Sequence, residues 1–141
     1  MTPTSFRLLV LCSVVLGLVG GCLDCLFPSL LPSSLTTAFE NEPPPALLSD
    51  SPALALALLV PFALVLLVST IGLLFFWRWS RTIALFSTVA GFGIYPLFGQ
   101  TLSSGWANSL LEASFTTWGA VLALAYFSPL SQRFVSQPNG R

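Results

Sequence analysis

The segment that decides the fold is ALALALLVPFALVLLVSTIGLLFFWRWSRTIALFSTVAGFGIYPLF, residues 53–98. It holds two long apolar runs, and only the arginine- and tryptophan-rich FWRWSR, residues 76–81, separates them. An apolar run of about 20 residues is long enough to cross the hydrocarbon core of a bilayer as an α-helix. The segment therefore predicts a hairpin of two membrane-spanning helices with its turn at the bilayer surface, where tryptophan side chains are favoured.

Two further apolar runs lie on either side of this hairpin and bring the predicted spans to four. The spans are Phe6–Phe27, Ala53–Trp77, Thr82–Phe98 and Trp106–Phe127. Residues 28–52 form a loop between the first two spans, in which we expect a short helix that begins at Ser33 or Ser34 and runs to Phe39, before Pro52 starts the second span. The composition agrees, since the 141 residues are 55% hydrophobic and only 7% charged. The sequence thus predicts one all-α, polytopic membrane domain.

The arginines predict how the chain is threaded. They all fall on one side of the four predicted spans, at Arg7, Arg78, Arg81, Arg133 and Arg141. Arginine and lysine near the ends of spans stay on the cytoplasmic side of a membrane. Because an even number of spans brings the two ends of a chain to the same side, we expect both termini in the cytoplasm.

The fourth span carries a row of polar and small residues on one helical face. The row is Asn108, Glu112, Thr116, Gly119 and Ala123. Glu112 is the ionisable residue in the interior of a span, and such a group costs on the order of 2 to 3 kcal/mol at mid-membrane. We therefore expect this face to look into the helix bundle. An antiparallel pairing of the third and fourth spans would bring Glu112 near Tyr95, Ser87 or Thr88.

Two hypotheses for Glu112 stay open at this point. In the first, it is a hydrogen-bonded acid that fixes helix packing together with Asn108, Thr116 and Tyr95. In the second, it is the site of a small proton- or cation-coupled transporter, since small multidrug transporters are also short four-helix proteins with a membrane glutamate.

In the first span, Ser13, Gly17 and Gly21 recur every four residues and predict a second packing stripe, because small residues let helix backbones approach closely in lipid.

The run GGCLDC, residues 20–25, has three interpretations. Cys22 follows a short apolar region as the lipidated cysteine of a lipoprotein signal does. Cys22 and Cys25 also form a CxxC pair, the spacing of a thiol-redox site. The third interpretation is that these are small residues at the end of a membrane helix, with no chemical role.

Reactive groups are scarce elsewhere in the chain. It has no histidine and no lysine, and it has five arginines and five acidic residues. Catalytic bases, metal ligands and phosphate-binding clusters are drawn from residue types that are absent or rare here. The sequence therefore predicts no catalytic residues, no metal, no cofactor and no nucleic-acid partner. We expect a non-enzymatic protein whose partners are the lipid bilayer and other membrane subunits or copies of itself.

Three stretches carry a resemblance to a protein family. They are SGWANSLLEASFTTWGAVLALAYFSPLSQRF at residues 104–134, FFWRWSR at 75–81 and GGCLDCLFPSLLP at 20–32. Together they resemble an uncharacterised family of short, four-span inner-membrane proteins of bacteria. The resemblance implies a multi-pass location in the bacterial inner membrane and supplies no activity or site residues.

Overall fold

The computed structural model describes residues 2–41, 52–98 and 101–135, and in this part of the chain the regular elements are all helical. They are α1 (Pro3–Leu26), the 3₁₀ turn η1 (Pro28–Leu30), α2 (Ser33–Glu40), α4 (Pro52–Leu74), α5 (Ser80–Ile94), the 3₁₀ turn η2 (Tyr95–Phe98), α6 (Gly105–Phe127) and α7 (Ser131–Val135). The predicted all-α class is confirmed. The predicted short helix in the loop is α2, and Pro52 begins α4 as expected, whereas the rest of that loop lies outside the described residues.

Within the described ranges, three helices are long and apolar enough to cross a membrane. They cover Pro3–Leu26, Ala53–Leu74 and Gly105–Phe127. The predicted span at residues 82–98 corresponds to α5, which has only 15 residues and continues as η2. Pro96 explains the change, because proline has no backbone N–H with which to continue the α-helical hydrogen bonds. Helix length therefore establishes three candidate spans and leaves a crossing by residues 82–98 as a prediction.

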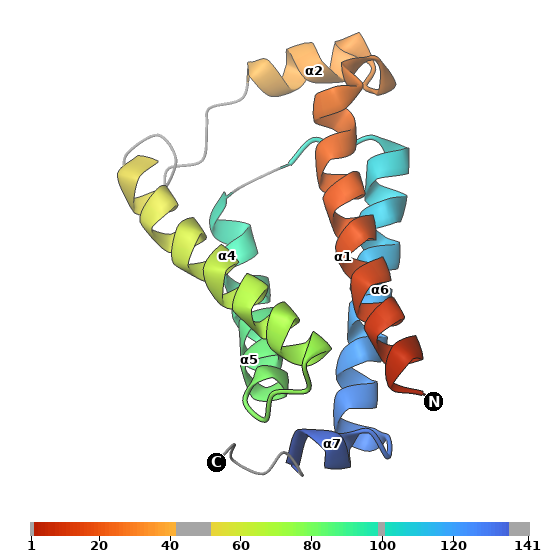
Figure 1. Cartoon of the computed structure of the whole chain (residues 1–141). Coiled ribbons are helices and arrows are strands. Elements are labelled where there is room, and N and C mark those ends of the chain that lie inside the picture. Colours follow the sequence, from red (N-terminus) through yellow and green to blue (C-terminus); the bar gives the residue numbers. More distant parts are fainter. Residues whose placement is uncertain (1, 42–51, 99–100, 136–141) are drawn as a thin grey trace.

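The long helices form two antiparallel pairs, α1 with α6 and α4 with α5 (Figure 1). The pairs converge at the end that holds the start of α1, the α4–α5 turn and α7, and they diverge toward α2. Helices α2 and α7 lie across opposite ends of the long helices. The fourth predicted span therefore has its main neighbour in the first span, rather than in the third as the sequence led us to expect.

The turn between α4 and α5 is tight because α4 ends in a Schellman motif. The N–H of Trp77 donates to the carbonyl of Gly72 at 2.8 Å, and the N–H of Phe76 donates to that of Leu73 at 3.3 Å. Phe76 holds the left-handed position with φ 58°, where glycine is usual; that conformation costs roughly 1–2 kcal/mol in an L-residue. A Cβ on Gly72 would lie 2.6 Å from the Cβ of Ser80, so only glycine admits the start of α5 here.

An aromatic cluster at the convergent end stabilises this strained turn. The rings of Phe6, Phe76 and Phe134 are all buried, with centroids 5.5 Å apart for Phe6 and Phe76 and 5.1 Å apart for Phe76 and Phe134. The Arg7 guanidinium lies 5.6 Å from the centroid of Phe76, and its Nε donates to the carbonyl of Leu74 at 2.9 Å. The cluster joins α1, the α4–α5 turn and α7, which fixes how the two helix pairs meet.

Candidate functional site

Helices α1 and α6 pack along a seam that follows a seven-residue repeat. On α1 the contacting residues are spaced alternately by four and three positions, and they are Phe6, Val10, Ser13, Gly17 and Gly20. On α6 the buried residues Ala107, Ser114, Val121 and Ala125 face them. A repeat of seven residues keeps one face of each helix against its partner over many turns. The seam therefore runs along most of both helices.

Two serines form a reciprocal bridge at the centre of the seam. The Ser13 hydroxyl donates to the carbonyl of Ser114 at 3.0 Å, and the Ser114 hydroxyl donates to the carbonyl of Ser13 at 2.8 Å. Both side chains are buried. The two bonds fix the register of α1 against α6, and each requires the helix backbones to lie close together.

Glycines on α1 permit that close approach. A Cβ on Gly17 would lie 2.9 Å from the Ser114 hydroxyl oxygen, and a Cβ on Gly20 would lie 3.1 Å from side-chain carbons of Leu110 and Leu111. A Cβ on Gly21 would meet nothing within 4 Å. Gly17 therefore lies in the seam with α6, whereas Gly21 lies outside it, and a packing role for Gly21 against another chain stays a prediction. The reason is that the contacting face repeats every 3.5 residues on average, so the position after Gly17 is three residues on.

The end of α1 meets the start of α6 at Asp24. Its Oδ2 accepts the backbone N–H of Ser104 at 2.8 Å, and the Ser104 hydroxyl in turn accepts the N–H of Ala107 at 3.2 Å. A carboxylate at a helix N-terminus satisfies free N–H groups and opposes the positive end of the helix dipole. The other carboxylate oxygen, Oδ1, is buried and has no hydrogen-bond partner within the described residues. The sequence analysis missed this contact because its two residues are 80 positions apart.

The polar row of α6 lies on the opposite face of the helix and is exposed. The rest of the described chain leaves all five residues of the row exposed, namely Asn108, Glu112, Thr116, Gly119 and Ala123. The Asn108 amide donates to Glu112 Oε1 at 2.9 Å, and the Thr116 hydroxyl donates to the backbone carbonyl of Glu112 at 2.8 Å. The expectation that this face looks into the bundle of one chain is therefore wrong, because the seam with α1 occupies the other side of α6.

The neighbours predicted for the Glu112 carboxyl group are engaged elsewhere. The Tyr95 hydroxyl shares a hydrogen bond of 3.0 Å with Thr101. Thr88 accepts a hydrogen bond from the indole of Trp118 at 2.9 Å, and this bond links α5 to α6. Ser87 donates to a carbonyl of its own helix at 3.1 Å. The polar row consequently makes its side-chain hydrogen bonds within α6.

Cys22 and Cys25 lie in the last two turns of α1. Both thiols are free and exposed, and so is that of Cys12. Cleavage before Cys22 would remove the α1 half of the seam, including Ser13 and Gly17. Lipidation and redox chemistry at these cysteines stay predictions.

The outer face of α6 offers amide, carboxyl and hydroxyl groups in a row, beside small residues. Within the described ranges, no group of three or more histidine, cysteine or acidic side chains is placed to hold a metal ion. Such a row is suited to hydrogen bonding across a contact with another helix. Comparison with protein-family profiles, with curated proteins and with solved structures found no match to this chain.

Proposed function

We propose that the protein is a four-span protein of the bacterial inner membrane with both termini in the cytoplasm. Helix length supports a crossing by the third predicted span, which α5 and η2 form together. The 15 residues of α5 rise about 1.5 Å each and the 4 residues of η2 about 2.0 Å each. Together they measure roughly 30 Å, which is the thickness of the hydrocarbon core.

The placement of the arginines supports the orientation. The convergent end of the molecule holds the described arginines Arg7, Arg78, Arg81 and Arg133, which come from α1, the α4–α5 turn, α5 and α7. These elements lie far apart in the sequence, and the fold brings them to one end. By the positive-inside rule this end faces the cytoplasm.

In this membrane we assign the protein a non-enzymatic role as an accessory or assembly subunit that binds another membrane helix. The observation that carries the proposal is the outward position of Asn108, Glu112 and Thr116 on a helix whose opposite face is already filled by α1. Lipid tails offer no hydrogen bonds, and an ionisable group facing them costs on the order of 2 to 3 kcal/mol. A partner helix that hydrogen-bonds to the row removes this cost.

Small residues on the same face suit the proposed contact. A Cβ on Gly119 would meet nothing within 4 Å, and Ala123 is exposed one turn further along α6. Small residues four positions apart let two membrane helices approach closely. The transporter hypothesis has less support, because Glu112 lines neither of the two grooves found between α4 and α5 and at their turn.

Purification in a mild detergent, followed by identification of co-purifying membrane proteins, tests the role. Gly119→Leu enlarges the outer face of α6 and should abolish the co-purification while leaving the fold intact. Gly93→Leu is the matched control, since a Cβ on Gly93 would also meet nothing within 4 Å, but this residue lies on α5. A partner that is lost equally in both variants, or recovery of the wild type only as a lone monomer, would refute the proposal.

A further inference from the structure

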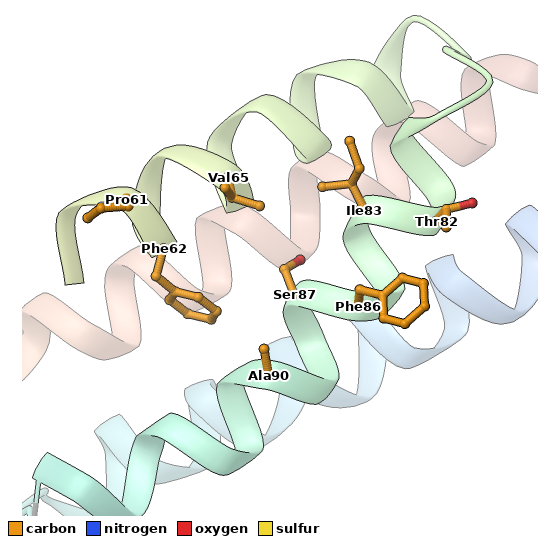
Figure 2. A pocket seen from close by; sticks show the side chains of 8 residues that line it. All are labelled: Pro61, Phe62, Val65, Thr82, Ile83, Phe86, Ser87 and Ala90. Atoms are coloured by element: carbon orange, nitrogen blue, oxygen red, sulfur yellow. The ribbon is translucent and has the colours of Figure 1, made fainter. Parts of the chain in front are cut away.

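An apolar groove runs between α4 and α5 (Figure 2). Its walls include Pro61, Phe62 and Val65 from α4, and Ile83, Phe86 and Ala90 from α5. The Ser87 hydroxyl also borders the groove, but it donates to a carbonyl of its own helix at 3.1 Å. The groove therefore presents an apolar surface with no unmet hydrogen-bonding group at Ser87.

A second groove continues from the first at the arginine end of the hairpin. Thr82 and Ile83 line both grooves, and Arg78 and Trp79 complete the second. Because they share these two residues, the two open grooves adjoin along the hairpin surface, and we refer to them together as the channel. The channel is apolar along the α4–α5 groove and cationic at its mouth, where Arg78 lies. An indole at the mouth is suited to the boundary between lipid tails and headgroups.

Arg78 differs from two of its neighbours in having no partner. The guanidinium of Arg7 bonds to a carbonyl and lies over Phe76, and that of Arg81 lies 5.3 Å from the ring centroid of Tyr126. Arg78 is exposed and makes no hydrogen bond or ion pair within the described chain. The described acids do not offset its charge, since two lie near the opposite end and the third lies in the N-terminal half of α6; they are Asp24, Glu40 and Glu112.

We propose that this channel binds one anionic phospholipid, with its phosphate at Arg78 and one acyl chain along the α4–α5 groove. Arginine pairs with phosphate through two parallel N–H donors, and the Thr82 hydroxyl at the mouth supplies a third. The surrounding arginines favour a headgroup that carries net negative charge. This inference is independent of the outer face of α6.

The length of the channel matches an acyl chain. From Ser80, where α5 begins, to Ala90 the helix advances 10 positions, which at 1.5 Å per residue is roughly 15 Å along the helix axis. One leaflet contributes about half of the 30 Å hydrocarbon core. A lipid anchored at Arg78 thus reaches the end of the groove with its chain extended.

Native mass spectrometry of the full chain tests the proposal. The protein is solubilised in mild detergent and offered equal amounts of phosphatidylglycerol and phosphatidylcholine. We expect the wild type to retain phosphatidylglycerol selectively, and this result requires no variant. Arg78→Gln should lower the retained anionic lipid about fivefold, as expected for one arginine at a membrane surface.

The matched charge control is Arg133→Gln, which removes an exposed arginine at the same end but outside the channel. It should retain the lipid. Equal losses in the two variants would show a general surface attraction and overturn the proposal, as would equal retention of the two lipids by the wild type.

A second pair of variants tests the apolar groove without changing charge. Ala90→Phe fills the groove and should reduce retention as strongly as Arg78→Gln, whereas Val89→Phe enlarges an exposed neighbour that does not line it. Full retention in Ala90→Phe would refute the acyl-chain site. Competition with inorganic phosphate separates a headgroup site from a lipid site, and displacement of the lipid by millimolar phosphate alone would also overturn the proposal.

Discussion

The two helix pairs of this protein pack in different ways. The middle of the α1–α6 seam holds the small residues Ser13, Gly17 and Ser114, and the two serine hydroxyls bond to the facing backbone. The α4–α5 pair also has close approaches, of Gly72 to Ser80 and of Gly91 to Phe62, but the buried hydroxyls of Ser69 and Ser87 donate to carbonyls of their own helices. A groove lined by larger apolar side chains stays open between α4 and α5. Leucine and valine pack as favourably against lipid as against another helix, so they do not select a partner. Close approach of the backbones and hydrogen bonds across the contact do select a partner helix.

Helix α6 shows the same contrast between its own two faces. Its inner face holds Ala107 and Ser114 against α1, and its outer face presents the hydrogen-bonded pair Asn108 and Glu112. The outward faces of α4 consist largely of leucine, valine and alanine. The surface of α4 is of the apolar kind that lipid covers, and this difference is the reason why we propose a protein partner for the outer face of α6.

The largest expected effect comes from filling the seam. Gly20→Leu places a side chain where a Cβ alone lies 3.1 Å from its neighbours, and overpacking of this kind costs about 1–3 kcal/mol of unfolding free energy. The measurement is reversible unfolding in mixed micelles as denaturing detergent is added. Gly21→Leu should be neutral or stabilising, because its position is open and leucine is the better helix former. Equal destabilisation of both variants would show that the α1–α6 seam is not packed more tightly than the open face of α1, and the comparison of the two helix pairs would fail.

Loss of the carboxylate at the α6 N-terminus should come next. Asp24→Ala removes the acceptor of the Ser104 N–H, and loss of one such hydrogen bond costs about 0.5–1.5 kcal/mol. Asp24→Asn keeps an acceptor oxygen and should recover most of that stability in the same unfolding measurement. Wild-type stability in Asp24→Ala would show that the contact contributes nothing to the α1–α6 pair.

A double-mutant cycle on the serine bridge should show a smaller effect. Ser13→Ala, Ser114→Ala and the double variant together isolate the coupling between the two residues. Hydrogen bonds between membrane helices average about 0.6 kcal/mol and reach about 1.7 kcal/mol in such cycles. A coupling energy of zero would leave close glycine packing as the sole determinant of register.

The smallest effect is expected in the groove of the other pair. Ala90→Leu enlarges a side chain as Gly20→Leu does, but into open space between α4 and α5. We expect a change in unfolding free energy within about 0.5 kcal/mol, as for substitutions away from packed features. A loss as large as that of Gly20→Leu would show that both helix pairs are packed equally tightly, and the comparison would fail.

Much of the architecture could be predicted from local pattern. Apolar runs of membrane-spanning length, the helix at Ser33–Glu40 and the shared face of Asn108, Glu112 and Thr116 each depend on residues within a few turns of one another. The candidate site was predicted only in part. Its polar residues share a face as expected, but the direction of that face and the roles of Gly20, Ser114 and Asp24 were missed.

The sequence by itself determined that this chain is helical, which segments are apolar enough for lipid, and which residues line up along each helix, because helical periodicity and hydropathy are local properties. Only the tertiary structure decided which face of α6 is covered. The Ser13–Ser114 contact spans 101 positions, and it forms because two surfaces match in shape and hydrogen bonding. In lipid, where burial itself favours no particular pairing, that match between distant segments selects α1 as the partner of α6.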